Sequence, residues 1–305
     1  MAYSRYWIQD TNFRGCDYTY YEGEHVNLTE LEEDHPDHGY LGRNSTPFYP
    51  ECVFDVANVC HVTEKSGLHG IFRDHGFRGN DSFLWWSLSV TDEDIVNAEN
   101  KFLTSQNFSW QNPNQKPFLK KFTTSPAFQS ESRYGNFRFT FKLKELLKIY
   151  SKEYCERTAP ILRVLDTKLY KQEILYSILV HPRYMTHYRK YPRLPIDDNS
   201  LCGYSQGSVS WRCQSPSNNY KYRLKVDDEE GEVSARPLRR TEYFVWDKVA
   251  VAFHMKRDWI LPVGHAQLFD NLSVCKTASK NLLKEPKMSV HEAKKEVENL
   301  RKMYL

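Results

Sequence analysis

Three things are scarce in this sequence of 305 residues: long apolar runs, an excess of charge of one sign, and closely spaced cysteines. No stretch approaches the roughly 18 consecutive apolar residues that a membrane-spanning helix needs. The first thirty residues contain Arg5, Asp10 and Arg14 instead of the apolar run of a signal peptide. We therefore expect a cytoplasmic protein, a nuclear protein, or one found in both compartments.

The charges nearly balance, with 42 Lys and Arg against 39 Asp and Glu, so charge alone does not predict nucleic-acid binding. The seven cysteines form no C-x-x-C pair, which argues against a disulfide framework and a zinc module. No metal site is expected, and His35 and His38 are interpreted as solvated loop residues. The strings typical of P-loop proteins, serine hydrolases, zincins and Rossmann domains are all missing.

What the chain has in quantity is aromatic residues, which make up 14% of it as 20 Tyr, 17 Phe and 7 Trp. These residue types favour strands. They predict a sheet-rich fold that has either an aromatic-lined cleft or an interaction surface.

The hydrophobic pattern divides the chain into three parts: an irregular N-terminal arm (residues 1–50), a folded domain (51–265) and a helical tail (266–305). A Tyr-, Arg- and Pro-rich insertion is expected at about 183–240. Apolar runs and period-2 alternation predict strands at 53–62, 82–90, 133–143, 161–164 and 171–180, and one or two within 242–255. Helical spacing predicts a helix that is capped by Ser66 and followed by Gly76 as a left-handed C-terminal residue, and further helices at 95–103 and 290–303, with a short turn at 145–147. Thr91 and Asp94 have the spacing of a capping box at the start of the helix at 95–103.

Taken in order, these elements give a strand with His-x-Thr, a helix, Gly-Phe, an aromatic strand, a helix, an alternating strand and a late strand led by Glu. This order resembles the ADP-ribosyltransferase superfamily, which includes poly(ADP-ribose) polymerases and diphtheria-type toxins. The resemblance implies an α+β fold with a mixed, mainly antiparallel split sheet. It also implies NAD as the substrate, and a protein or a nucleic acid as the acceptor of ADP-ribose.

The resemblance assigns roles to residues of the first two strands. His61 would hydrogen-bond a ribose hydroxyl of NAD, and Thr63 would support the nicotinamide end. A ring from Trp85 or Trp86 would stack on the nicotinamide. Val62 stands where the family has glycine, so this chain departs from the pattern at that position.

Two glutamates are candidates for the catalytic acid that stabilises the oxocarbenium-like transition state. Glu173 leads the strand that ends at His181-Pro182, as in the toxin-like branch, and it is favoured for its shorter spacing from His61. Glu242 leads Glu-Tyr-Phe-Val-Trp-Asp, which is similar to the corresponding strand of the polymerases. Both remain open.

Two other classes of function compete with the transferase. A catalytically inactive protein of the same fold would use its aromatic cleft to bind a partner, for example in host defence. An RNA-binding module would use the Tyr/Arg-rich insertion, in which Arg183, Arg189 and Lys190 alternate with tyrosines suited to base stacking.

Overall fold

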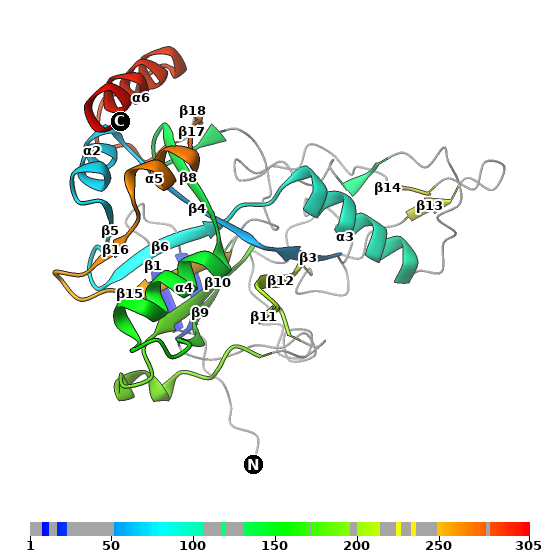
Figure 1. The fold of residues 1–305 in the computed structure, drawn as a ribbon. Coiled ribbons are helices and arrows are strands. Elements are labelled where there is room, and N and C mark those ends of the chain that lie inside the picture. The colour runs from blue at the N-terminus through cyan, green and yellow to red at the C-terminus, as the bar shows by residue number, and fades with distance from the viewer. Residues whose placement is uncertain are drawn as a thin grey trace.

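The computed structural model has an α+β fold built on a mainly antiparallel sheet, which confirms the predicted class (Figure 1). It describes residues 8–11, 17–22, 52–105, 117–119, 131–170, 173–195, 200–213, 224–226, 233–235, 249–278 and 281–305. Across these ranges, none of the helices has both the length and the apolar composition needed to cross a membrane.

The main sheet has nine strands in the order β1-β2-β9-β10-β15-β6-β4-β8-β17. Within it, β10 and β15 run parallel, and the other neighbouring strands are antiparallel. In sheet order the strands are β1 (Ile8–Thr11), β2 (Asp17–Glu22), β9 (Ile161–Tyr170), β10 (Glu173–His181), β15 (Val249–His254), β6 (Phe83–Leu88), β4 (Asn58–Thr63), β8 (Phe137–Lys142) and β17 (Leu272–Val274).

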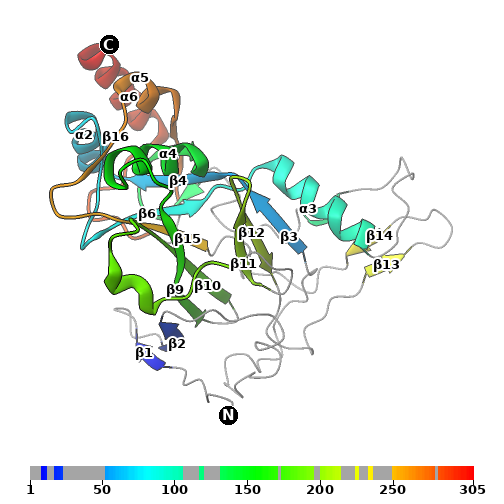
Figure 2. The same cartoon turned by 60° about the horizontal axis from the view of Figure 1, so that its bottom comes forward.

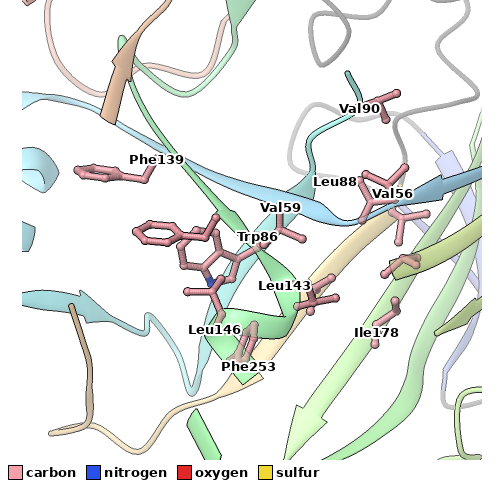
Figure 3. Packing of buried hydrophobic residues seen from close by; sticks show 14 of the residues in the cluster. Val56, Val59, Trp86, Leu88, Val90, Phe139, Leu143, Leu146, Ile178 and Phe253 are labelled. Atoms are coloured by element: carbon pink, nitrogen blue, oxygen red, sulfur yellow. The ribbon is translucent and has the colours of Figure 1, made fainter. Parts of the chain in front are cut away.

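One face of this sheet carries the core, because period-2 alternation puts large apolar side chains on it. On β8 these are Phe137, Phe139 and Phe141, which are all buried as the sequence predicts. Figure 3 shows Trp86 among the same core side chains, with Leu143 and Leu146 nearby. We call this side of the sheet the core face.

Helices α2 (Lys65–Arg73) and α4 (Leu143–Tyr154) cover the core face. The Tyr150 ring of α4 meets Phe253 edge to face with centroids 5.2 Å apart, and its hydroxyl donates to His254 O at 2.7 Å. On α2, the Phe72 ring lies 6.3 Å from that of Phe139. These contacts fix both helices against the sheet.

Smaller elements surround this core. A three-stranded sheet is formed by β11 (Cys202–Ser205), β12 (Ser208–Cys213) and β3 (Cys52–Val56). The two-stranded pairs are β5 (Gly76–Arg78) with β16 (Ile260–Pro262), β7 (Glu131–Ser132) with β18 (Lys276–Thr277), and β13 (Leu224–Val226) with β14 (Val233–Ala235). The other helices of the described residues are α3 (Asp92–Ser105), the 3₁₀ helix η3 (Thr186–Lys190), α5 (His265–Asp270) and α6 (Val290–Tyr304). Helices α5 and α6 lie beside α2 (Figures 1 and 2).

The structure differs from the predicted irregular arm at residues 1–50, because β1 and β2 form a hairpin there. β2 joins the main sheet by pairing with β9. The two strands are short, and the partner of β2 is far along the chain, so no local pattern revealed them.

The predicted ends of the first helix are also wrong. Its N-cap is Glu64, and Ser66 lies inside α2. At the C-terminal end His75, with φ of 53°, takes the left-handed conformation that was expected of Gly76. Gly76 is needed in β5 for another reason, since a Cβ there would lie 2.2 Å from the carbonyl oxygen of Leu261.

Parts of the predicted insertion and of the predicted tail also pair with strands of the folded domain. Part of the insertion belongs to the fold, because β12 pairs with β3 and Trp211 is buried. The main sheet likewise continues past residue 265, since β17 pairs with β8. By contrast, the capping box of Thr91 and Asp94 is confirmed, with Asp94 N donating to Thr91 Oγ1 at 3.1 Å.

Candidate functional site

The candidate site lies where strands β4 and β6 separate. They pair only at Val59 with Leu88 and at Cys60 with Ser87. β4 nevertheless stays paired with β8 as far as Thr63. The sheet is therefore split from His61 onward, and we call this opening the fork.

The side chain of His61 bridges the fork. Its Nδ1 lies 2.9 Å from the backbone oxygen of Trp85, and since a carbonyl oxygen only accepts, Nδ1 carries the proton. Burial lowers the pKa of His61, with the bond to Trp85 opposing the shift, so the ring is neutral near pH 7. The other ring nitrogen, Nε2, is then an acceptor, and no residue that the structure describes donates a hydrogen bond to it.

Two aromatic rings hold the imidazole in place. The ring centroid of His61 lies 5.4 Å from that of Phe77 and 5.5 Å from that of Trp86. Phe77 and Trp86 also meet each other edge to face at 5.0 Å. The side chain of His61 is half-buried, so the cage around it is incomplete.

The two adjacent tryptophans point to opposite faces of β6, as strand geometry requires. Trp86 is on the core face with His61 and is 1% exposed, whereas Trp85 is on the other face and is 41% exposed. Among the described residues, nothing accepts a hydrogen bond from the buried Nε1 of Trp86. The structure thus brings the Trp86 ring to His61, and Trp85 reaches it only through its backbone oxygen.

Thr63 ends β4 on the same face as His61, and glycines allow its close packing. A Cβ on Gly67 would lie 1.9 Å from Thr63 Oγ1, and one on Gly135, whose φ is 138°, would lie 2.0 Å from Thr63 O. The next residue, Glu64, accepts hydrogen bonds at 2.7 Å from the backbone N–H groups of Lys284 and Glu285. The C-terminal segment is therefore fastened to this end of the fork.

Neither candidate acid lies beside His61 in the part of the chain that the structure describes. Glu173 is the first residue of β10, and β10 lies three strands away from β4. Glu173 is four residues from Ser177, which lies level with Cys60 across the paired strands. At ~3.3 Å per residue and ~4.8 Å per strand, its backbone is roughly 20 Å from that of Cys60. Glu242 lies outside the described residues, seven positions before the start of β15.

The predicted RNA-binding segment supplies fewer free rings than its sequence indicates. Tyr188 and Tyr191 are buried in a cluster with Leu179 and Met185. Tyr184 is 51% exposed. The segment thus combines exposed basic side chains with rings that mostly serve packing.

Sequence reasoning missed a basic row on α4, formed by Lys144, Lys148 and Lys152. Their spacing of four residues was a usable signal, but only a short turn had been predicted at 145–147, and a row requires a full helix.

No family model, curated protein or solved structure matches this chain significantly. The functional proposal below therefore rests on the geometry of the fork.

Proposed function

We propose that this chain binds NAD at the fork and acts as an ADP-ribosyltransferase-like protein. The observation that carries the proposal is the position of His61, a neutral half-buried histidine with an unused acceptor nitrogen where β4 and β6 separate. A ribose hydroxyl is a donor that such a nitrogen can accept from.

The surroundings of His61 support this role. Phe77 and Trp86 restrict the ring, and the bond to Trp85 O selects its tautomer, so the acceptor is oriented before a ligand arrives. Thr63 lies two residues further along the same face, where the resemblance places the nicotinamide end.

The proposed reaction breaks the bond between the nicotinamide nitrogen and C1′ of the ribose. Nicotinamide leaves with the electron pair, and an acceptor nucleophile bonds to C1′ and gives up its proton. A carboxylate would stabilise the positive charge that develops on the ribose. Glu173 and Glu242 are both tested for this role, and the distance of roughly 20 Å between the backbones of Glu173 and Cys60 counts against Glu173. The acceptor would be a protein or a nucleic acid.

A protein that binds NAD without consuming it is the second candidate, and Val62 favours it. Val62 has a side chain at the position where the resemblance calls for glycine and a close backbone approach to the nicotinamide. The two candidates predict the same ligand and differ in turnover.

The test is nicotinamide release from NAD by the purified chain, with calorimetric NAD binding measured on the same samples. The variants are His61→Phe, Glu173→Gln and Glu242→Gln. His61→Phe keeps an aromatic ring against Phe77 and Trp86 but removes both nitrogens, so NAD binding should fall about tenfold or more through loss of one buried hydrogen bond.

Loss of turnover with retained binding in one glutamate variant would identify the acid. Binding without turnover in the unmodified chain would establish the second candidate. Absence of both from the unmodified chain would refute the proposal.

A further inference from the structure

A groove separate from the fork runs along α4. It has a volume of about 630 Å³ and lies between α4, the loop that follows it, the start of β9, and β11. Figure 2 shows α4, β11 and β12 side by side on this side of the molecule. The groove lies on the core face of the main sheet, next to β9.

One wall of the groove is a row of positive charges. Lys144, Lys148 and Lys152 are exposed and recur every four residues, so they lie on one side of α4 with a rise of ~6 Å between successive positions. Lys152 also forms an exposed 3.5 Å ion pair with Glu153, which contributes little in water. Among the described residues that line the groove there is no Asp or Glu.

A fourth cation, Arg157, closes the end of the row in an unusual backbone conformation. Glu156 and Arg157 have φ values of 51° and 61°, a left-handed region that costs energy for residues with a Cβ. Arg157 N donates to Ser151 O at 3.0 Å, and Ser151 Oγ donates to the carbonyl oxygen of Thr158 at 2.7 Å. The turn thus holds a strained arginine at the groove.

The floor of the groove is mainly aliphatic. It is formed by Leu147, Pro160 and Leu162, with Tyr204 at one side. Pro160, Leu162 and Tyr204 are all half-buried, so they offer apolar surface to an incoming side chain. Tyr204 is the one aromatic residue among the described lining residues, and one ring does not supply the successive stacking platforms that single-stranded nucleic acid needs.

We propose that this groove docks an acidic peptide segment of a partner protein, one in which aliphatic side chains are interspersed with carboxylates. The carboxylates pair with the lysine row and Arg157, and an aliphatic side chain lies on the floor. Charge complementarity supports this occupant, because the lining residues that the structure describes include four cations and no carboxylate. The proposal does not depend on NAD binding.

The test uses fluorescence anisotropy with a labelled peptide of four Glu-Glu-Leu repeats. Three other probes are compared: a Gln-Gln-Leu peptide of the same length, a Glu-Glu-Ser peptide, and a thymidine oligonucleotide of twelve nucleotides. We expect the Glu-Glu-Leu peptide to bind most tightly. The Gln and Ser peptides should each be weaker, since one lacks the charges and the other lacks the apolar side chains.

Substitutions then locate the site. Replacing Lys144, Lys148 and Lys152 together by Gln keeps good helix formers on α4 and should weaken binding about tenfold or more, from three exposed charge pairs. Replacing Lys294, Lys295 and Lys302 together by Gln, on the exposed surface of α6, removes the same number of charges and should leave binding unchanged.

Two substitutions of opposite charge at one lining position separate the effect of charge from that of side-chain size. Ala159 lines the groove and is exposed, so Ala159→Glu should weaken binding about threefold or more, whereas Ala159→Arg should preserve or strengthen it. The proposal is overturned if the oligonucleotide binds more tightly than the acidic peptide, or if no probe binds. It is also overturned if the triple variant binds as the unmodified chain does, or if the two Ala159 variants behave alike.

Discussion

Two buried histidines should make the stability of this protein depend on pH. His181 accepts a hydrogen bond at 2.9 Å from Arg163 Nε through Nε2, and its Nδ1 lies 2.8 Å from Pro182 O. His254 Nδ1 lies 2.6 Å from the hydroxyl oxygen of Tyr188, and its Nε2 is buried with no partner in the described part of the chain. A proton added to Nε2 of His181 would face the N–H group of Arg163, which is itself a donor. A proton added to His254 would bring a positive charge into the buried interior.

Burial is the main cause that lowers the pKa of both rings from 6.5 to about 4, with nearby positive charge adding to it. Because the folded pKa is depressed, the unfolded chain binds protons first as the pH falls below 6.5. The stability that the two neutral rings contribute to the folded state is therefore fully present above pH 6.5, and it is lost as the pH falls towards 4. Between pH 7 and pH 5 the free energy of unfolding should decrease by about 2 kcal/mol for each ring.

Urea unfolding followed by tryptophan fluorescence at pH 7, 6 and 5 measures this loss. The control is the double variant His181→Gln, His254→Asn, in which amide oxygens replace the accepting nitrogens and do not titrate. Its free energy of unfolding should change much less across the same range. If the unmodified chain and the double variant lose equal stability between pH 7 and pH 5, the reasoning is refuted.

Two further pairs of substitutions test the packing around the fork. Gly135→Ala should lower the free energy of unfolding by about 2 kcal/mol or more, because its Cβ would collide with Thr63 O at a φ of 138°. Gly264→Ala should change it little, because no described residue other than the two chain neighbours has an atom within 4 Å of the added carbon, and thermal melts of the two variants will show the difference. Trp86→Ala should cost about 3–5 kcal/mol in urea unfolding because the ring is buried. Trp85→Ala should cost about 1 kcal/mol or less, and equal losses for the two would contradict the assignment of faces.

The parts of the fold that local sequence predicts are those set by neighbouring residues. The alternation of Phe137, Phe139 and Phe141 required a strand with one buried face, and the structure has it. The Thr91–Asp94 capping box likewise depends on two residues of one turn.

Features that depend on distant segments were not predictable in this way. β2 is a strand because β9 satisfies its backbone, and β12 belongs to the core because β3 pairs with it. The twelve-residue length of α4 is a different case, because its signal was local and was missed: Leu143, Leu146, Leu147 and Tyr150 recur at helical spacing and are all buried.

The candidate site shows the same division. His61 and Thr63 were identified from a short motif, but their role rests on where β4 leaves β6, and no local pattern contains that register. The neutral state of His61 depends on burial beside Phe77 and Trp86, which come from other elements.

The most direct test of the central claim is the nitrogen-15 NMR spectrum of the histidine rings, recorded with and without NAD. His61→Phe assigns the signals of His61 by their loss. The account predicts that near pH 7 Nδ1 is protonated and Nε2 is not, and that NAD shifts the Nε2 resonance in the direction of an accepted hydrogen bond. An Nε2 resonance that does not respond to saturating NAD would contradict the claim that the fork holds the dinucleotide.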